Sequence, residues 1–170
     1  MAANYANYNA DLTRTIPVSG RFSRRQREVY DAVLRVLRAT SKAAIPGKFP
    51  KVWQKEAETL MQEELLRLGL LKKSQVKKQK EGEPPALKKY FMHGVGHPLG
   101  LDVHDLGITT EPIQRGWVLT VEPGIYIPDE GMAVRLENNI LVSDGGNVDL
   151  MEKLPLEAEE IEHAMRRGRK

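Results

Sequence analysis

Three of the four histidines in this chain lie within twelve residues of one another, at His93, His97 and His104. The first two have the spacing of a metal-binding pair on a helix. However, Gly94 and Gly96 between them are typical of a loop whose backbone approaches a ligand closely. Imidazole nitrogens bind metals and transfer protons near neutral pH. Alone, the cluster is equally compatible with a metal or catalytic site and with histidines that have no chemical role.

Carboxylates elsewhere in the chain favour the first interpretation. Glu122 ends one apolar stretch, and Glu137 lies in another with Arg135 two residues before it. Because residues two apart on a strand share a face, Arg135 and Glu137 are expected to point the same way. Each glutamate alone also fits a surface ion pair, and Asp11 alone fits a turn. Together with one histidine, the three carboxylates form a set of oxygen and nitrogen ligands that suits Mn, Co, Fe or Zn.

Caps and helix breakers predict the helices that support these residues. Residues 1–22 are expected to be extended and to end in a turn. Ser23 has the features of a helix N-cap, and Gln26 completes a capping box three residues later. A proline–glycine pair ends this first helix. A second helix is predicted over residues 50–68, with Gly69 as its C-cap.

Short strands separated by glycine and proline are predicted after the two helices. A final helix is expected over residues 156–167. The strands are expected at residues 90–92, 118–121, 125–127, 132–136 and 139–142. Helices followed by strands and a closing helix predict an α+β fold. The 170 residues, 41% of them hydrophobic, suit one domain with a substantial core.

Composition and charge exclude several classes of protein. No apolar run approaches the roughly 18 residues of a membrane helix, and the first residues lack the features of a signal peptide. The chain contains no cysteine, which excludes disulfides and thiolate zinc sites and fits the cytoplasm. The net charge is only +3. The densest lysine run, residues 72–80, has no interleaved aromatic residue, so we expect a solvated segment and no nucleic-acid partner.

Four segments carry a more specific signal. They are Tyr8-x-x-Asp11-Leu-Thr-Arg-Thr15, His93-Gly-x-Gly-His97-x-x-Gly-Leu-Asp-Val-His-Asp105, Thr120-Val-Glu-Pro-Gly-Ile-Tyr126 and Val134-Arg-Leu-Glu137. In this order they resemble the catalytic domain of Xaa-Pro aminopeptidases (aminopeptidase P), in the pita-bread metallopeptidase superfamily. Prolidases share most of these motifs. The resemblance implies that residues 1–170 are the C-terminal part of a pita-bread catalytic domain, incomplete at its N-terminal side.

The resemblance also implies a metal centre. Its metal ligands would be Asp11, His97, Glu122 and Glu137. Members of the family bind two ions, typically manganese, and cobalt, iron and zinc are compatible with the same ligands. Paired cations lower the pKa of a bridging water and stabilise the charge of a tetrahedral intermediate.

Further residues receive substrate-related roles from the same resemblance. His104 would contact the substrate or the intermediate, and His93 would help to hold the scissile peptide. Tyr126 and Arg135 would line the pocket around proline, and Glu137 would also accept the proton of the nucleophilic water. The implied activity is removal of the first residue from peptides that have proline in second position.

One family feature has no counterpart in this sequence. The family's pattern includes a further aspartate ligand eleven residues before the position of Asp11, which would fall before Met1, and Asn4 stands where the pattern has a glutamate. We therefore expect a weakened second metal site and reduced activity. We also expect an exposed sheet edge and apolar helix faces that favour a homo-oligomer or other association. A prolidase, and an inactive pita-bread module for binding or assembly, are the alternative functions.

Overall fold

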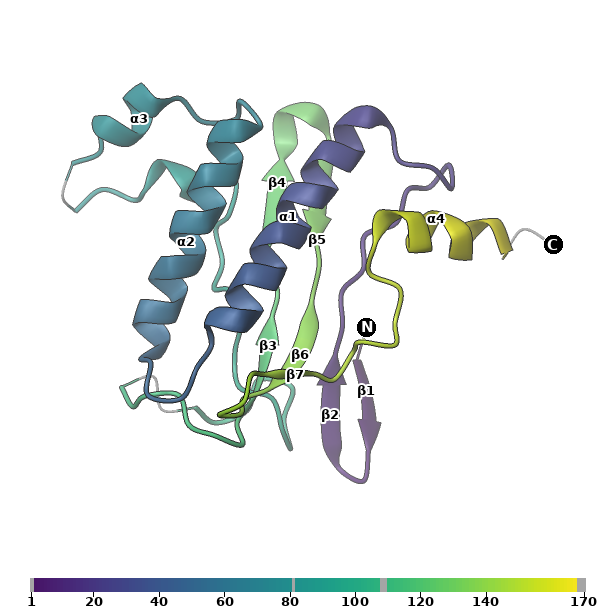
Figure 1. The fold of residues 1–170 in the computed structure, drawn as a ribbon. Helices are drawn as coiled ribbons and strands as arrows, with labels where there is room; N and C mark the ends of the chain where they lie inside the picture. The colour runs from purple at the N-terminus through teal and green to yellow at the C-terminus, as the bar shows by residue number, and fades with distance from the viewer. Residues whose placement is uncertain (1, 81, 108–109, 168–170) are drawn as a thin grey trace.

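The structure is a computed structural model that describes residues 2–80, 82–107 and 110–167 (Figure 1). Helices and strands follow one another in the order expected for an α+β chain. The strands are β1 (Ala2–Tyr5), β2 (Tyr8–Asp11), β3 (Val118–Val121), β4 (Gly124–Ile127), β5 (Met132–Arg135), β6 (Asn138–Leu141) and β7 (Val148–Asp149). The α-helices are α1 (Arg24–Ala43), α2 (Pro50–Arg67), α3 (Lys73–Lys77) and α4 (Ala158–Arg167), and 3₁₀ turns lie at Ala86–Lys89 and Pro128–Glu130.

The first segment of the chain is a hairpin rather than a single extended stretch. Strands β1 and β2 pair antiparallel, with Tyr5 opposite Tyr8. The two residues between them, Ala6 and Asn7, have φ of 50° and 65°. Positive φ at both central residues is typical of the two-residue turns whose twist matches that of the paired strands. The hairpin places Asp11 at the last position of β2.

The two long helices begin and end as the sequence predicts. The Ser23 hydroxyl accepts a hydrogen bond from the Gln26 amide at 3.2 Å, and the Gln26 side chain accepts one from the Ser23 amide at 2.8 Å. This reciprocal pair confirms the predicted capping box at the start of α1. Gly69 follows α2 with φ of 73°, a conformation that favours glycine after a helix. Figure 1 shows α1 and α2 side by side.

Strands β3 to β6 form one long, bent hairpin. Val118 pairs with Leu141 at one end, and Ile127 pairs with Met132 near the tip. The pairs β3–β6 and β4–β5 have the same register. Pairing breaks at residues 122–123 on one side and at residues 136–137 on the other, and these two breaks therefore lie opposite each other. Glu122 lies in one break and Glu137 in the other. The register therefore brings these two glutamates face to face at the bend.

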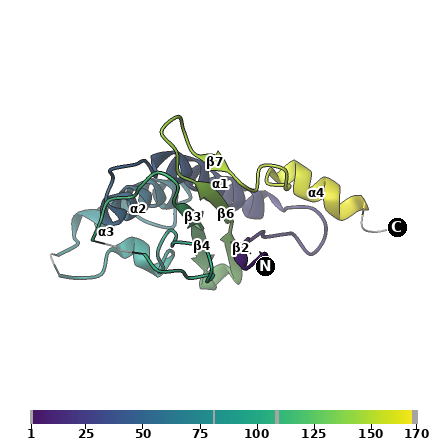
Figure 2. The same cartoon turned by 90° about the horizontal axis from the view of Figure 1, so that it is seen from below.

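The helices cover one face of these strands. Seen from below in Figure 2, α1 and α2 lie on one side and strands β3, β4 and β6 on the other. Apolar residues of both layers form one buried cluster, which includes Leu37, Met61, Ile125 and Ile140. None of the described helices is long and apolar enough to cross a membrane.

One local prediction was wrong, and one strand was missed. Residues 90–92 are not a strand: they follow the 3₁₀ turn at Ala86–Lys89 as irregular backbone. Phe91 is nevertheless fully buried, and the Tyr90 carbonyl accepts a hydrogen bond from the Tyr126 amide at 2.9 Å. The apolar run thus reflects core packing rather than pairing. Strand β7 was not predicted, because a two-residue strand has no periodicity to detect.

Candidate metal centre

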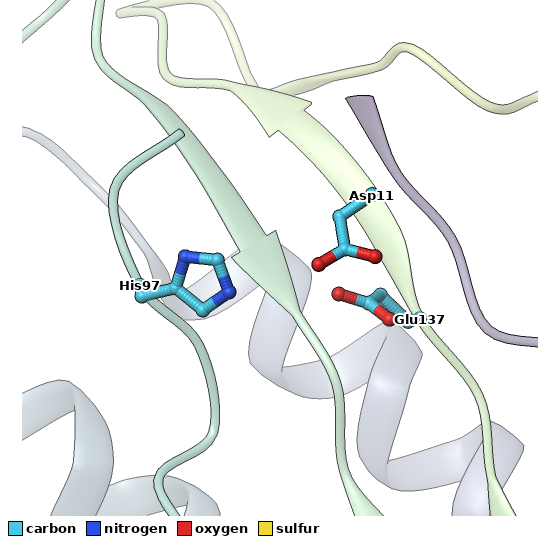
Figure 3. Close-up of side chains that lie close together, drawn as sticks. All are labelled: Asp11, His97 and Glu137. Carbon is cyan, nitrogen blue, oxygen red and sulfur yellow. The ribbon is translucent and has the colours of Figure 1, made fainter. Parts of the chain in front are cut away.

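Three ligand types from distant parts of the sequence meet in one place. Asp11 ends β2, His97 lies in the glycine-rich loop, and Glu137 lies between β5 and β6. One potential ligand atom from each residue lies within 4.8 Å of the other two. Figure 3 shows the three side chains pointing toward one another. The sequence predicted all three as metal ligands, and the fold brings them together.

Backbone pairing beyond β2 fixes Asp11 relative to Glu137. Thr13 forms an antiparallel bridge with Glu137, whose amide donates to the Thr13 carbonyl at 3.0 Å. The Arg14 guanidinium donates to the Glu137 carbonyl at 2.7 Å and to Asn138 Oδ1 at 2.8 Å. Burial lowers the pKa of Arg14, and the nearby Asp149 and Glu137 carboxylates oppose that shift. Arg14 thus joins the two segments that present the carboxylates.

The loop that carries His97 is bound to strand β3. The His97 amide donates to the Thr120 hydroxyl at 3.0 Å, and the Thr120 amide donates to the His97 carbonyl at 2.9 Å. A Cβ atom at Gly96 would lie 1.9 Å from the Thr120 carbonyl oxygen. Only a glycine therefore allows this close approach, which holds the imidazole beside the sheet.

Glu137 is the most confined member of the cluster. Its side chain is 2% exposed. Oε2 accepts a hydrogen bond from the Thr13 hydroxyl at 2.5 Å, whereas Oε1 is buried and has no partner among the described residues. Burial raises the pKa of Glu137, and the carboxylates of Glu122 and Asp11 raise it further, while Thr13 and Arg135 oppose the shift. Several carboxylates around an unpartnered buried oxygen fit a divalent cation, which would neutralise the carboxylates and bind that oxygen.

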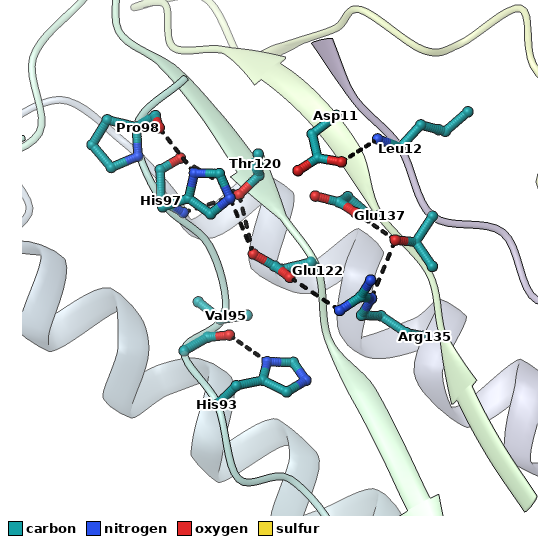
Figure 4. Close-up of polar contacts among 12 residues, drawn as sticks. Asp11, Leu12, His93, Val95, His97, Pro98, Thr120, Glu122, Arg135 and Glu137 are labelled. Carbon is teal, nitrogen blue, oxygen red and sulfur yellow. Dashed lines mark hydrogen bonds and ion pairs between the residues drawn. The ribbon is translucent and has the colours of Figure 1, made fainter. Parts of the chain in front are cut away.

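The fourth predicted ligand, Glu122, lies beside this cluster. Its Oε1 is 3.4 Å from His97 Nε2, and its Oε2 is 3.9 Å from the Arg135 guanidinium (Figure 4). Glu122 is not within the 4.8 Å group. It lies on the same face of the hairpin as the group, opposite Glu137.

The predicted substrate-binding residues surround the cluster. His104 stacks on His97, with ring centroids 3.8 Å apart and planes 13° apart. His93 Nε2 lies 2.8 Å from the Tyr126 hydroxyl. Burial raises the pKa of Tyr126, and the nearby Arg135 opposes that shift. These contacts place an imidazole and a phenol next to each other at the rim of the site.

Arg135 and Glu137 point to the same side, as their spacing predicts. Arg135 Nε donates to the Thr13 hydroxyl at 3.1 Å, and the same hydroxyl donates to Glu137. Thr13 and Thr120 form hydrogen bonds with candidate site residues, and the sequence analysis did not single them out. Each lies two residues from a predicted ligand in an extended segment, Thr13 after Asp11 and Thr120 before Glu122. This period-two spacing was the signal available in the sequence.

Comparisons with known proteins agree with this geometry. Metallopeptidase family M24 matches residues 1–144. The Xaa-Pro aminopeptidase of Haemophilus influenzae is 39% identical over 95% of this chain, and that of Escherichia coli is 38% identical over 98%. The structure of a zinc-substituted aminopeptidase P from Escherichia coli in complex with product has a TM-score of 0.84 and 37% identity, covering 98% of this chain.

The chain spans 40% of the length of each of these relatives. The resemblance to Xaa-Pro aminopeptidases and the α+β, pita-bread fold class are thereby confirmed. With a family match over residues 1–144 and relatives close to 40% identical, this chain belongs to metallopeptidase family M24.

Proposed function

We propose that this chain binds a divalent cation and removes the first residue from peptides that have proline in second position. One observation carries the proposal: ligand atoms of Asp11, His97 and Glu137 lie within 4.8 Å of one another, on the face where Glu122 faces Glu137. The names of the relatives, Xaa-Pro aminopeptidases, support the choice of substrate class.

Manganese is the cation that we propose for this set of residues. Three carboxylates and one imidazole make an oxygen-rich set, which suits Mn²⁺, although Zn²⁺ also binds such ligands. The cation would act as a Lewis acid and lower the pKa of a water nucleophile. Asp11, His97, Glu122 and Glu137 are the residues that would hold the cation.

Glu137 would also accept a proton during the reaction. Its side chain lies beside the candidate ligands Asp11 and His97, where a bound cation would activate a water molecule. The Thr13 hydroxyl and the backbone bridge between Thr13 and Glu137 prevent the side chain from turning away. A positioned carboxylate of this kind is what general-base catalysis requires.

Residues at the rim would recognise the peptide. Tyr126 offers an aromatic surface to a proline ring, and His93 fixes its hydroxyl at 2.8 Å. The Arg135 side chain is 43% exposed, and its guanidinium would bind a peptide carbonyl or carboxylate. His104, stacked on His97, would donate a proton or hydrogen bond to the scissile peptide.

The proposal is tested by incubating the chain with Mn²⁺ and an Xaa-Pro-Yaa tripeptide. Mass spectrometry follows release of the first residue. The Glu137→Ala variant should release none. Glu159→Ala is the matched control, because Glu159 lies on α4 in an exposed ion pair with Arg27, and this variant should match the unmodified chain.

Three outcomes contradict the proposal. They are no release from the unmodified chain, release that persists in Glu137→Ala, and equal loss in Glu159→Ala. An Xaa-Pro dipeptide tested in parallel should remain intact. Cleavage of the dipeptide alone would assign a prolidase instead.

A further inference from the structure

Strand β6 presents two different asparagines to the two faces of the hairpin. Side chains alternate along a strand, so Glu137 and Asn139 share one face and Asn138 points to the other. Asn138 is fully engaged on its face: its amide donates to Asp149 at 2.6 Å, and its oxygen accepts from Arg14 at 2.8 Å. Asn139, on the face of Glu137, has no such partners.

The side chain of Asn139 is buried and unsatisfied. It is 1% exposed, and its carboxamide oxygen has no hydrogen-bond partner among the described residues. Buried polar atoms in folded proteins are almost always paired, so an orphan oxygen calls for an explanation. In the described part of the chain only two other buried side-chain atoms share this condition, Glu137 Oε1 and Thr40 Oγ1. Asn139 and Glu137, two residues apart on one strand, therefore present two unpartnered acceptor oxygens to the same side.

The strand register locates Asn139 beneath the candidate centre. On one side Asn139 pairs directly with Thr120 of β3, whose hydroxyl accepts from the His97 amide. On the other side, β6 lies in contact with β2, and Glu137 forms an antiparallel bridge with Thr13, two residues after Asp11. Asn139 thus lies between the segments that carry Asp11 and His97, two residues along the strand from Glu137.

Asn139 Oδ1 and Glu137 Oε1 are both acceptors when Glu137 is ionised, so neither oxygen can satisfy the other. The Asn139 amide group does not donate to Glu137 Oε1 either, since that oxygen has no partner among the described residues. A cation satisfies both, since carboxylate and amide oxygens are ligands that Mn²⁺ accepts. We propose that Asn139 is a further residue of the metal centre, and that its carboxamide oxygen is satisfied only when a divalent cation is bound. This inference rests on the proposed metal-binding function and assigns a specific role to a residue outside the four predicted ligands.

The test compares two variants at position 139 with one at position 40. Asn139→Leu keeps the shape of the side chain and removes its oxygen, whereas Asn139→Asp keeps an oxygen in place. Thr40→Val removes the third orphan atom, which lies in α1 and outside the group of candidate ligands. Isothermal titration calorimetry measures the Kd for Mn²⁺, and circular dichroism measures the midpoint of thermal unfolding without metal.

Asn139→Leu should weaken Mn²⁺ binding at least about tenfold, as loss of supporting groups at metal sites does. Its metal-free unfolding midpoint should not fall, because an unsatisfied polar group has been replaced by an apolar one of similar shape. Asn139→Asp should bind Mn²⁺ at least as tightly as the unmodified chain. Thr40→Val should leave the Kd unchanged.

Opposite results separate this inference from the function on which it rests. If the unmodified chain does not bind Mn²⁺, the proposed metal centre itself is wrong. If the unmodified chain binds and Asn139→Leu binds equally well, the role of Asn139 alone is wrong. A folded Asn139→Leu with reduced stability and unchanged Kd would show a purely structural role. If Asn139→Leu does not fold, Asn139→Asp decides, because weaker Mn²⁺ binding by that variant would overturn the inference.

Discussion

A methyl group at Gly96 should disrupt the loop that positions the candidate metal ligand His97. In Gly96→Ala the new Cβ atom would lie 1.9 Å from the Thr120 carbonyl oxygen and 2.9 Å from the carbonyl carbon. Both atoms belong to the backbone of a paired strand, so they cannot move aside as a flexible side chain would. The loop must therefore shift away from β3.

The shift should lower the free energy of unfolding through overpacking and through the loss of hydrogen bonds. Overpacking of this kind costs about 1 to 3 kcal/mol. The loop also loses its two hydrogen bonds to Thr120, at 3.0 Å and 2.9 Å. At about 1 kcal/mol for each bond, the free energy of unfolding should fall by roughly 3 to 5 kcal/mol in total. Because His97 moves with the loop, the affinity for Mn²⁺ should fall as well.

Gly94 provides a matched control two residues away in the same loop. A Cβ atom there would meet only Gln54 Oε1, at 3.9 Å, an ordinary van der Waals contact. Gly94→Ala should therefore change the free energy of unfolding by less than about 1 kcal/mol. Urea unfolding followed by circular dichroism measures both variants. Equal stability of the two variants, or a Gly96→Ala protein as stable as the unmodified chain, would refute the close-approach argument.

Two further predictions concern the helix that supports the sheet. Ser23→Ala removes the N-cap of α1 and should lower the free energy of unfolding by about 1 kcal/mol in urea titrations, and an unchanged midpoint would contradict the capping box. Burial raises the pKa of Tyr30 to about 12, so its stabilising contribution is complete below pH 10 and is lost as the pH rises toward 12. The free energy of unfolding should fall between pH 9 and pH 11.5 in the unmodified chain. In Tyr30→Phe this fall should be about 2 kcal/mol smaller, because phenylalanine does not titrate. Equal losses would show that Tyr30 does not titrate with a raised pKa.

Local signals in the sequence predicted the helices whose ends carry capping residues. The capping box at Ser23 and the left-handed Gly69 each specify a backbone conformation within a few residues, and both helix ends lie where these residues predict. The prediction of a strand at residues 90–92 was wrong, because a short apolar run fits a buried irregular segment as well as a strand. The hairpin turn at Ala6 and Asn7 was missed because alanine is uncommon at positive φ.

The candidate site was predictable by residue type and only partly by geometry. Motif resemblance identified Asp11, His97 and Glu137, which the fold brings together. The opposition of Glu122 and Glu137 depends on a register shared by two strand pairs, and spacing along the chain does not determine it. The unpartnered oxygen of Asn139 is likewise visible only after the strands are paired. Long-range register, rather than local propensity, therefore decides which polar groups face the centre.

We propose above that His97 binds a divalent cation together with the carboxylates around it. Electron spin-echo envelope modulation of the chain loaded with one equivalent of Mn²⁺ detects an imidazole nitrogen bound to the ion. We predict this nitrogen signal in the unmodified chain and in His163→Gln, whose side chain is exposed on α4. His97→Gln should lack the signal. A nitrogen signal that persists in His97→Gln, or none in the unmodified chain, would contradict the assignment of this centre.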